Sequence, residues 1–163
     1  MKKIIFIILL CTFGLLSQKS NAQISLKINI VSQPIWGPEG YDYVEYYYLP
    51  EIDVYYNVAR HRYIYMSHNQ WIVSLQLPPH YRSFDVYHAR KVIINEQRPY
   101  LRHDHFKQKY AHSNDYSNQR SIRDSNDEKY YKNKHHPKHN NWKIAKKNSH
   151  NKGRQNKHSK HKK

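Results

Sequence analysis

Tyrosine is concentrated in one part of this 163-residue chain, since thirteen of its sixteen tyrosines lie between residues 41 and 110. Tyrosine favours strands because its ring packs on a pleated surface while its hydroxyl stays hydrated or hydrogen-bonded. Proline and glycine interrupt the same region repeatedly, so each strand must be short. The distribution predicts a mainly β module, stabilised by cross-strand aromatic pairs that contribute about 0.2–1 kcal/mol each.

Short runs of alternating or β-favouring residues mark the expected strands of this module. They cover residues 24–31, 41–48, 51–57, 62–66, 70–74 and 87–94. Residues 67–70 predict a hairpin turn, with Asn69 best able to adopt a left-handed backbone. Pro99, His103, Phe106 and Tyr110 then recur at helical spacing, which predicts one short amphipathic helix over 99–110. The expected fold is a small antiparallel meander closed by that helix.

The first 22 residues have the pattern of a cleavable secretory signal peptide. Two lysines precede an apolar run from Ile4 to Leu16, and Ser20 and Ala22 place small residues at positions −3 and −1 of a cleavage site. The run is shorter than the roughly 20 apolar residues that span a bilayer, although an uncleaved anchor is the alternative. We expect an exported protein, located in the periplasm, at the outer envelope or outside the cell. Cys11 is the only cysteine, so the mature chain has neither disulfides nor thiolate chemistry.

The positive charge belongs mainly to the C-terminal third. Residues 23–110 carry a net charge of +2 and residues 111–163 a net charge of +11. Residues 111–163 have too little apolar content to offset the entropy of ordering, so the composition predicts a disordered, Lys/His-rich tail.

Such a basic segment is attracted to dense anions without sequence specificity. Because export removes cytosolic nucleic acid as a specific partner, we expect anionic cell-envelope polymers or the membrane surface: glycolipid, acidic polysaccharide or extracellular DNA. A tail that only confers solubility is the alternative. The residues expected to contact polyanions are Lys132, Lys134, Lys138, Lys143, Lys146, Lys147, Lys152, Arg154 and Lys157.

Histidines suggest a second function for the tail. Nine of the thirteen lie at or beyond residue 103, and His135, His136 and His139 are closely spaced. Imidazole nitrogens bind Zn²⁺, Cu²⁺ or Ni²⁺, and a His-rich tract of this kind binds such ions loosely. A loose divalent-metal-binding protein is therefore one alternative function. The other interpretation is that these histidines are ordinary soluble tail residues.

The tyrosines of the module also allow two interpretations. In the first, one face of a thin sheet is buried and the aromatic ladders simply stabilise the meander. In the second, a solvent-facing row of Tyr55, Tyr63 and Trp71 forms an aromatic surface that binds glycans or peptides, as exposed aromatic residues often do.

No catalytic motif is present in the sequence. It has no glycine-rich phosphate loop, no nucleophile elbow and no zincin motif, and the spacing of its carboxylates and histidines selects no acid–base pair. We therefore expect a noncatalytic protein that needs no cofactor. Asp53, Glu96 and Arg98 are expected to form structural ion pairs near the junction of the last strand and the helix.

Two segments resemble a known group of proteins. They are VYYNVARHRYIYMSHNQWIVSLQLPPHYRSFDVY (Val54 to Tyr87) and KVIINEQRPYLRHDHF (Lys91 to Phe106). Together they are similar to small exported proteins of flavobacteria-like Gram-negative bacteria, most specifically in the Asn-Glu-x-Arg-Pro-Tyr pattern at 95–100. The chain departs from that group at the turn around Asn69, which lacks the usual glycine. The group has no assigned activity, so the resemblance implies export and fold only.

Overall fold

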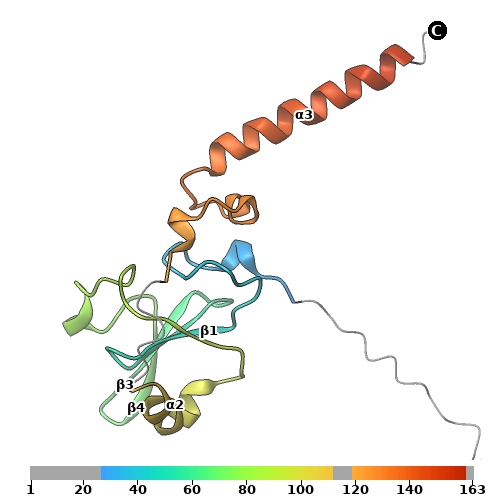
Figure 1. The fold of residues 1–163 in the computed structure, drawn as a ribbon. Helices are drawn as coiled ribbons and strands as arrows, with labels where there is room; N and C mark the ends of the chain where they lie inside the picture. Colours follow the sequence, from blue (N-terminus) through green and yellow to red (C-terminus); the bar gives the residue numbers. More distant parts are fainter. Residues whose placement is uncertain (1–26, 112–118, 161–163) are drawn as a thin grey trace, which may run out of the picture.

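A five-stranded antiparallel sheet forms the centre of the molecule (Figure 1). The computed structural model describes residues 27–111 and 119–160, with the side chains of 151–160 excepted; the predicted signal peptide lies outside these ranges. The spatial order of the strands is β4-β3-β2-β1-β5. The strands are β1 (Tyr46–Leu49), β2 (Val54–Asn57), β3 (Arg62–Ser67), β4 (Gln70–Ser74) and β5 (Val92–Ile94). The predicted mainly β fold is confirmed.

Hairpin connections join the first four strands into a meander. In the β3–β4 hairpin, Ser67 pairs with Gln70, and both His68 and Asn69 have positive φ angles of 47° and 59°. Two consecutive left-handed residues are the signature of a type I′ turn, which matches the twist of the flanking strands. The predicted hairpin is therefore confirmed even though the turn contains no glycine. β5 departs from a simple meander because it crosses to pair with β1 at the opposite edge.

The N-terminal strand predicted over 24–31 is not seen in its described part. Residues 27–29 lie in no regular element, and the 3-10 helix η1 (Ile30–Ser32) follows them. The side chain of Asn29 takes the place of a strand partner: its Oδ1 accepts from Val44 N at 3.0 Å and its Nδ2 donates to Val44 O at 2.6 Å. The alternation of apolar residues does not show that a side chain, rather than a neighbouring strand, forms the hydrogen bonds with these backbone groups.

The predicted helix covers one face of the sheet. The 3-10 helix η3 (Pro99–Arg102) runs directly into α2 (His103–Tyr110), and Phe106 of α2 packs among the rings of that face. Tyr48 and Tyr55 stack there with ring centroids 4.7 Å apart. Polar contacts also fix the helix, because Asp53 forms an ion pair with Lys107, accepts a hydrogen bond from Tyr48 Oη at 2.7 Å and lies 3.8 Å from His103 Nε2.

The opposite face of the sheet, which was expected to be exposed to solvent, is covered as well. Trp36 lies across it with its ring 5.3 Å from Tyr47 and 5.0 Å from Tyr56, and the segment 77–87 covers the end near Leu49. All four residues of β1 and all four of β2 are consequently buried. Sequence alternation predicts which residues share a face, but the loops that cover the second face are contributed by distant parts of the chain.

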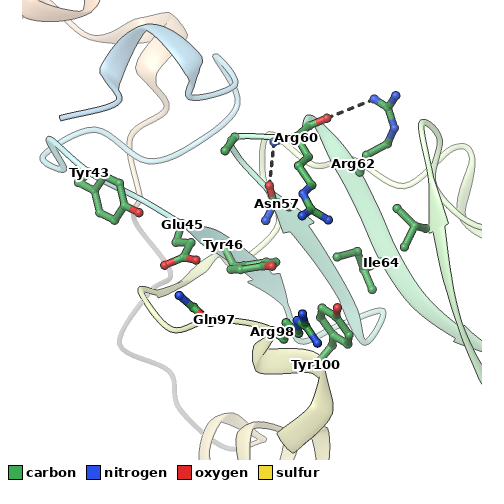
Figure 2. A pocket seen from close by; sticks show the side chains of 12 residues that line it. Tyr43, Glu45, Tyr46, Asn57, Arg60, Arg62, Ile64, Gln97, Arg98 and Tyr100 are labelled. Atoms are coloured by element: carbon green, nitrogen blue, oxygen red, sulfur yellow. Dashed lines mark hydrogen bonds between the residues drawn. The ribbon is translucent and has the colours of Figure 1, made fainter. Parts of the chain in front are cut away.

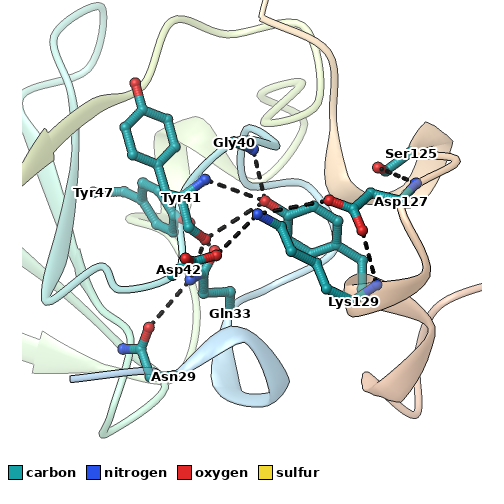
Figure 3. Close-up of polar contacts among 10 residues, drawn as sticks. Asn29, Gln33, Gly40, Tyr41, Asp42, Tyr47, Ser125, Asp127 and Lys129 are labelled. Carbon is teal, nitrogen blue, oxygen red and sulfur yellow. Dashed lines mark hydrogen bonds and ion pairs between the residues drawn. The ribbon is translucent and has the colours of Figure 1, made fainter. Parts of the chain in front are cut away.

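Part of the region expected to be a disordered tail is packed onto the N-terminal segment. After a gap at 112–118, the 3-10 helices η4 (Ile122–Asp124) and η5 (Glu128–Lys132) lie against residues 30–41. Ile122 and Tyr130 are fully buried there beside Ile30. Tyr130 Oη accepts hydrogen bonds from the backbone amides of Gly40 at 2.6 Å and of Tyr41 at 3.2 Å. We call the packed segment 119–138 the joint, and Figure 3 shows its polar contacts with the N-terminal segment.

The prediction of disorder fails for this joint because a few apolar residues are enough to order a segment that packs on an existing surface. Asn133 Nδ2 donates to Gln33 O at 2.7 Å, and Ile122 N donates to Gly37 O at 2.7 Å, so backbone groups on both sides are satisfied. The apolar content of a segment gives no information about the surface on which the segment packs.

The last described element is a single long helix. α3 (His139–Lys160) begins just after this joint and extends away from the sheet, as Figure 1 shows. Its side chains from Lys143 to His150 are all exposed.

Candidate functional site

The strongest charge feature of the molecule lies on α3. From Lys129 to the last residue the chain contains thirteen lysines and arginines and no aspartate or glutamate. Lys143, Lys146, Lys147 and His150 are spaced three or four residues apart, so they occupy one face of the helix. All four side chains are exposed. The structure thus arranges the predicted polyanion-binding residues of this segment as a one-sided basic stripe.

Contacts at the first turn fix the start of α3. His139 Nδ1 donates to the backbone oxygen of Tyr131 at 2.8 Å, and the His139 ring lies 5.9 Å from that of Trp142. Lys146 Nζ lies 5.1 Å from the centre of the same indole ring. The helix therefore leaves the joint in a defined direction, and its basic stripe begins one turn later.

The other predicted polyanion contacts are more dispersed. Lys132 and Lys134 are exposed near the joint, whereas Lys138 Nζ donates to Asn126 Oδ1 at 2.6 Å and to Tyr131 Oη at 3.2 Å. Lys152, Arg154 and Lys157 belong to the part of α3 whose side chains lie outside the described residues. In the sequence, Arg154 and Lys157 continue the spacing of the stripe.

The three histidines of the predicted metal site do not form one. His136 is buried, its Nδ1 accepts from the backbone amide of Lys138 at 3.1 Å, and its ring lies 4.8 Å from that of Tyr131. Burial lowers the pKa of His136 below its usual value, so this ring adds no charge near neutral pH. His135 is exposed and lines a pocket together with Trp36 and His61, whereas neither His136 nor His139 is among the residues that line that pocket. Within the described ranges, no group of three histidine, cysteine or carboxylate side chains is placed to hold a metal ion.

The predicted aromatic row is divided between the two faces of the sheet. Tyr55 is fully buried and meets Trp71 edge-on, with centroids 6.0 Å apart. Tyr63 pairs with Tyr56 in the β2–β3 register, and their rings are 4.9 Å apart on the other face. The prediction of a solvent-facing row is therefore wrong, because helix α2 and the Trp36 segment cover the rings that the row required.

Asp85 and His88 form a close acid–base pair in an exposed turn. Asp85 Oδ2 lies 2.5 Å from His88 Nδ1, and this contact holds the pKa of Asp85 below its usual value. Backbone amides of Tyr87 and His88 donate to the other oxygen of Asp85. Asp85 thus stabilises a local turn, and this structural role explains why the pair forms.

A pocket of about 500 Å³, which the sequence did not reveal, lies at the end of the sheet near η3. Its lining comes from strands β1 to β4, from the residues just before β1, from the β2–β3 connection and from the 97–100 segment (Figure 2). Three of the lining residues are arginines, Arg60, Arg62 and Arg98, and the single carboxylate is that of Glu45. Tyr46, Ile64 and Tyr100 contribute apolar surface.

The ion pairs predicted around Arg98 are rearranged in the structure. Glu96 pairs with Arg102 at 2.8 Å and Asp53 pairs with Lys107. Within the described residues, no carboxylate oxygen lies within 4.0 Å of a guanidinium nitrogen of Arg60, Arg62 or Arg98. Arg98 instead takes a left-handed backbone conformation (φ 49°, ψ 52°), which for a non-glycine residue is a strained state often found at functional sites. The sequence signal was weak: three arginines scattered over 39 positions.

Comparisons with known proteins add no assignment. The chain matches no protein-family model, and searches against curated proteins and solved structures give no match. The resemblance to exported proteins of flavobacteria-like bacteria therefore stays a prediction. Within residues 27–111 and 119–160, no helix combines the length and hydropathy needed to cross a membrane.

Proposed function

We propose that this is a noncatalytic exported protein that binds anionic polymers of the cell envelope through the basic stripe of α3. The observation that carries the proposal is the exposed, acid-free face formed by Lys143, Lys146, Lys147 and His150 on a helix that extends away from the sheet. The ligand class is a polymer with closely spaced anions: acidic polysaccharide, glycolipid headgroups or extracellular DNA.

The geometry of the stripe suits a linear polymer rather than a small anion. A helix rises 1.5 Å per residue, so the seven intervals from Lys143 to His150 cover about 10 Å of helix length. Exposed charges spread over this length attract successive anions of a chain and release its counterions. Exposed cations of this kind give salt-sensitive binding and little stereochemical selection.

The folded module supports the stripe by fixing where the helix starts. Tyr130 and Ile122 tie the joint to residues 30–41, and His139 ties α3 to the joint. Mild acidification should strengthen binding, because the basic segment contains histidines and an imidazole side chain ordinarily gains charge when the pH falls below about 6.5. His136 does not take part in this gain, since burial lowers its pKa.

The test is salt-dependent retention on immobilised heparin, polyuronate and duplex DNA. The triple variant Lys143→Gln, Lys146→Gln and Lys147→Gln removes three charges from the stripe without touching the module. We expect retention to fall, and the slope of log affinity against log salt on DNA to decrease by about 2–3, as the loss of three phosphate contacts requires.

A charge-matched control separates the stripe from overall charge. The variant Lys27→Gln, Arg82→Gln and Lys109→Gln removes three exposed charges from the module and should keep the salt slope of the unaltered protein. Equal losses in the two variants would mean that net charge alone governs retention. Full retention of the stripe variant on all three polymers would contradict the proposal.

A further inference from the structure

We infer that the arginine-lined pocket is a second, stereospecific site that binds one oxyanion-bearing hexose unit, such as a uronic acid or a sulfated sugar. The inference concerns the sheet module and does not depend on α3. It rests on three features of the pocket: an excess of guanidinium groups over carboxylates, an aromatic and aliphatic wall, and hydroxyl-binding polar groups.

The positive charge in the pocket exceeds the negative charge, because three arginines line it with one carboxylate, Glu45, and none of the three forms an ion pair within the described residues. Figure 2 shows Arg60 extending from the β2–β3 connection and Arg98 from the segment before η3, on different sides of the hollow. Arg62 lies at the rim, where its Nη1 donates to the backbone oxygens of Arg60 and His61, both at 3.2 Å. A guanidinium group matches a carboxylate or sulfate geometrically, with two parallel N–H donors.

The walls of the pocket suit a sugar ring. Tyr46 and Ile64 line the hollow and are buried, and Tyr100 is half-buried beside them, so these side chains present fixed apolar surface. Tyr100 is braced by the rings of Tyr46, Tyr55 and Trp71 at centroid distances of 6.5, 6.4 and 5.4 Å. Such a wall can pack against the C–H face of a hexose, as small-molecule pockets with apolar linings commonly do.

Polar groups around the same space can bind hydroxyls. Glu45 supplies carboxylate acceptors, whereas Asn57 and Gln97 supply both donors and acceptors. Asn57 is oriented before any ligand arrives, because its Oδ1 accepts from the backbone amide of Arg60 at 2.8 Å. The volume of about 500 Å³ lies in the range of roughly 300–1,000 Å³ that small-ligand sites have.

The backbone conformation of Arg98 helps to form the pocket. Its left-handed conformation turns the chain just before Pro99 and holds the guanidinium group on the pocket side (Figure 2). Asn95, two residues before the pocket-lining Gln97, accepts a hydrogen bond from Glu45 N at 2.9 Å and ties this loop to the start of β1. Two distant segments of the sequence are thereby held on either side of the same hollow.

The experiment is calorimetric and NMR titration of the full chain with single sugars at constant ionic strength. The probes are glucuronate, galactose 6-sulfate, neutral glucose and inorganic sulfate. We expect one or both anionic sugars to bind about 10- to 100-fold more tightly than glucose, the gain that charged hydrogen bonds confer. The better of the two identifies the oxyanion. Shifts should be confined to Arg60, Arg98 and Tyr46, and inorganic sulfate should bind more weakly than the sulfated sugar.

Variants test the assignment of the two arginines. Arg60→Gln and Arg98→Asn should each weaken binding of the preferred sugar about 10- to 100-fold; asparagine is chosen at Arg98 because it tolerates the left-handed backbone. Arg82→Gln removes the same charge elsewhere on the module and should leave the affinity unchanged. The inference is overturned if glucose binds as well as the anionic sugars, if no sugar binds, or if Arg82→Gln weakens binding as much as either pocket variant.

The stripe variant distinguishes this inference from the proposed function. Lys143→Gln, Lys146→Gln and Lys147→Gln should leave binding of single sugars unchanged while lowering retention on polymers. Loss of single-sugar binding in that variant would place the sugar on α3 and contradict the pocket.

Discussion

The sheet module and helix α3 use opposite physical strategies within one chain. In the module, neutral rings such as Tyr47, Tyr48 and Tyr55 are fully buried between covered faces. In α3, every side chain from Lys143 to His150 is exposed and none of them is acidic. The module therefore gains its stability from burial, which is insensitive to salt, whereas α3 depends on local hydrogen bonds and carries charge that salt screens.

A small domain without cysteines can carry a strongly basic element when the two parts are kept separate. The joint at 119–138 separates the two: it is anchored by Tyr130 on one side and by His139 on the other. Repulsion among the lysines is kept away from the aromatic core, and the module does not have to neutralise it.

The largest expected effect is alkaline unfolding of the module. Burial raises the pKa of Tyr56 to about 12 and raises the pKa values of Tyr47, Tyr48 and Tyr55 as well. Because the unfolded chain releases these protons near pH 10 and the folded chain retains them, the stability is fully present below pH 10 and falls as the pH rises above it. Circular dichroism should be lost in one cooperative step, together with the appearance of the part of the tyrosinate absorbance that comes from the buried rings. Tyrosinate absorbance that develops fully near pH 10 on an intact fold would show that these rings are not buried.

The next largest effect concerns a single ring. Tyr47→Ala removes a fully buried ring that contacts Trp36 and should lower the free energy of unfolding by about 3–5 kcal/mol. Tyr47→Phe, which deletes only the hydroxyl that donates to Gln33 Oε1, should cost about 1 kcal/mol. Urea denaturation followed by tryptophan fluorescence measures both. Similar small losses in the two variants would mean that the second face is not packed as described.

A smaller effect tests whether the joint folds with the module. Tyr130→Phe removes the acceptor of the Gly40 and Tyr41 amides and should cost about 1–3 kcal/mol. Hydrogen exchange at those two amides should accelerate. The control is Tyr131→Phe, whose hydroxyl donates to Asn126 O at the exposed side of the joint and should matter less. An unaltered transition in the first variant would show that the joint folds apart from the sheet.

The smallest effect is on α3 itself. Lys143 faces Lys147 four residues on and Lys146 three residues on, and such like-charged pairs cost about 0.2–0.5 kcal/mol each. Lys143→Gln should therefore raise the helical signal slightly, and added salt should do the same to the unaltered protein. The free energy of unfolding of the module should stay within about 0.5 kcal/mol. A change larger than that would mean that α3 contributes to the core.

Local pattern was enough for several elements. The type I′ turn at His68–Asn69 and the helix over 99–110 follow from turn chemistry and apolar spacing, which involve residues only a few positions apart. These features could be predicted because neighbours in sequence decide them. The helix α3 was not predicted, since the composition of residues 111–163 indicates disorder.

The other features depend on contacts between parts of the chain that are distant in sequence. The tertiary structure buried Tyr55 under α2, took Tyr63 to the opposite face, and placed Tyr130 in a cradle formed some 90 residues earlier in the chain. It also brought Arg60 and Arg98 to one pocket and gave Glu96 and Asp53 other partners. The physical reason is the same in each case: burial and ion pairing depend on which distant surfaces meet, whereas periodicity records only what is near in sequence.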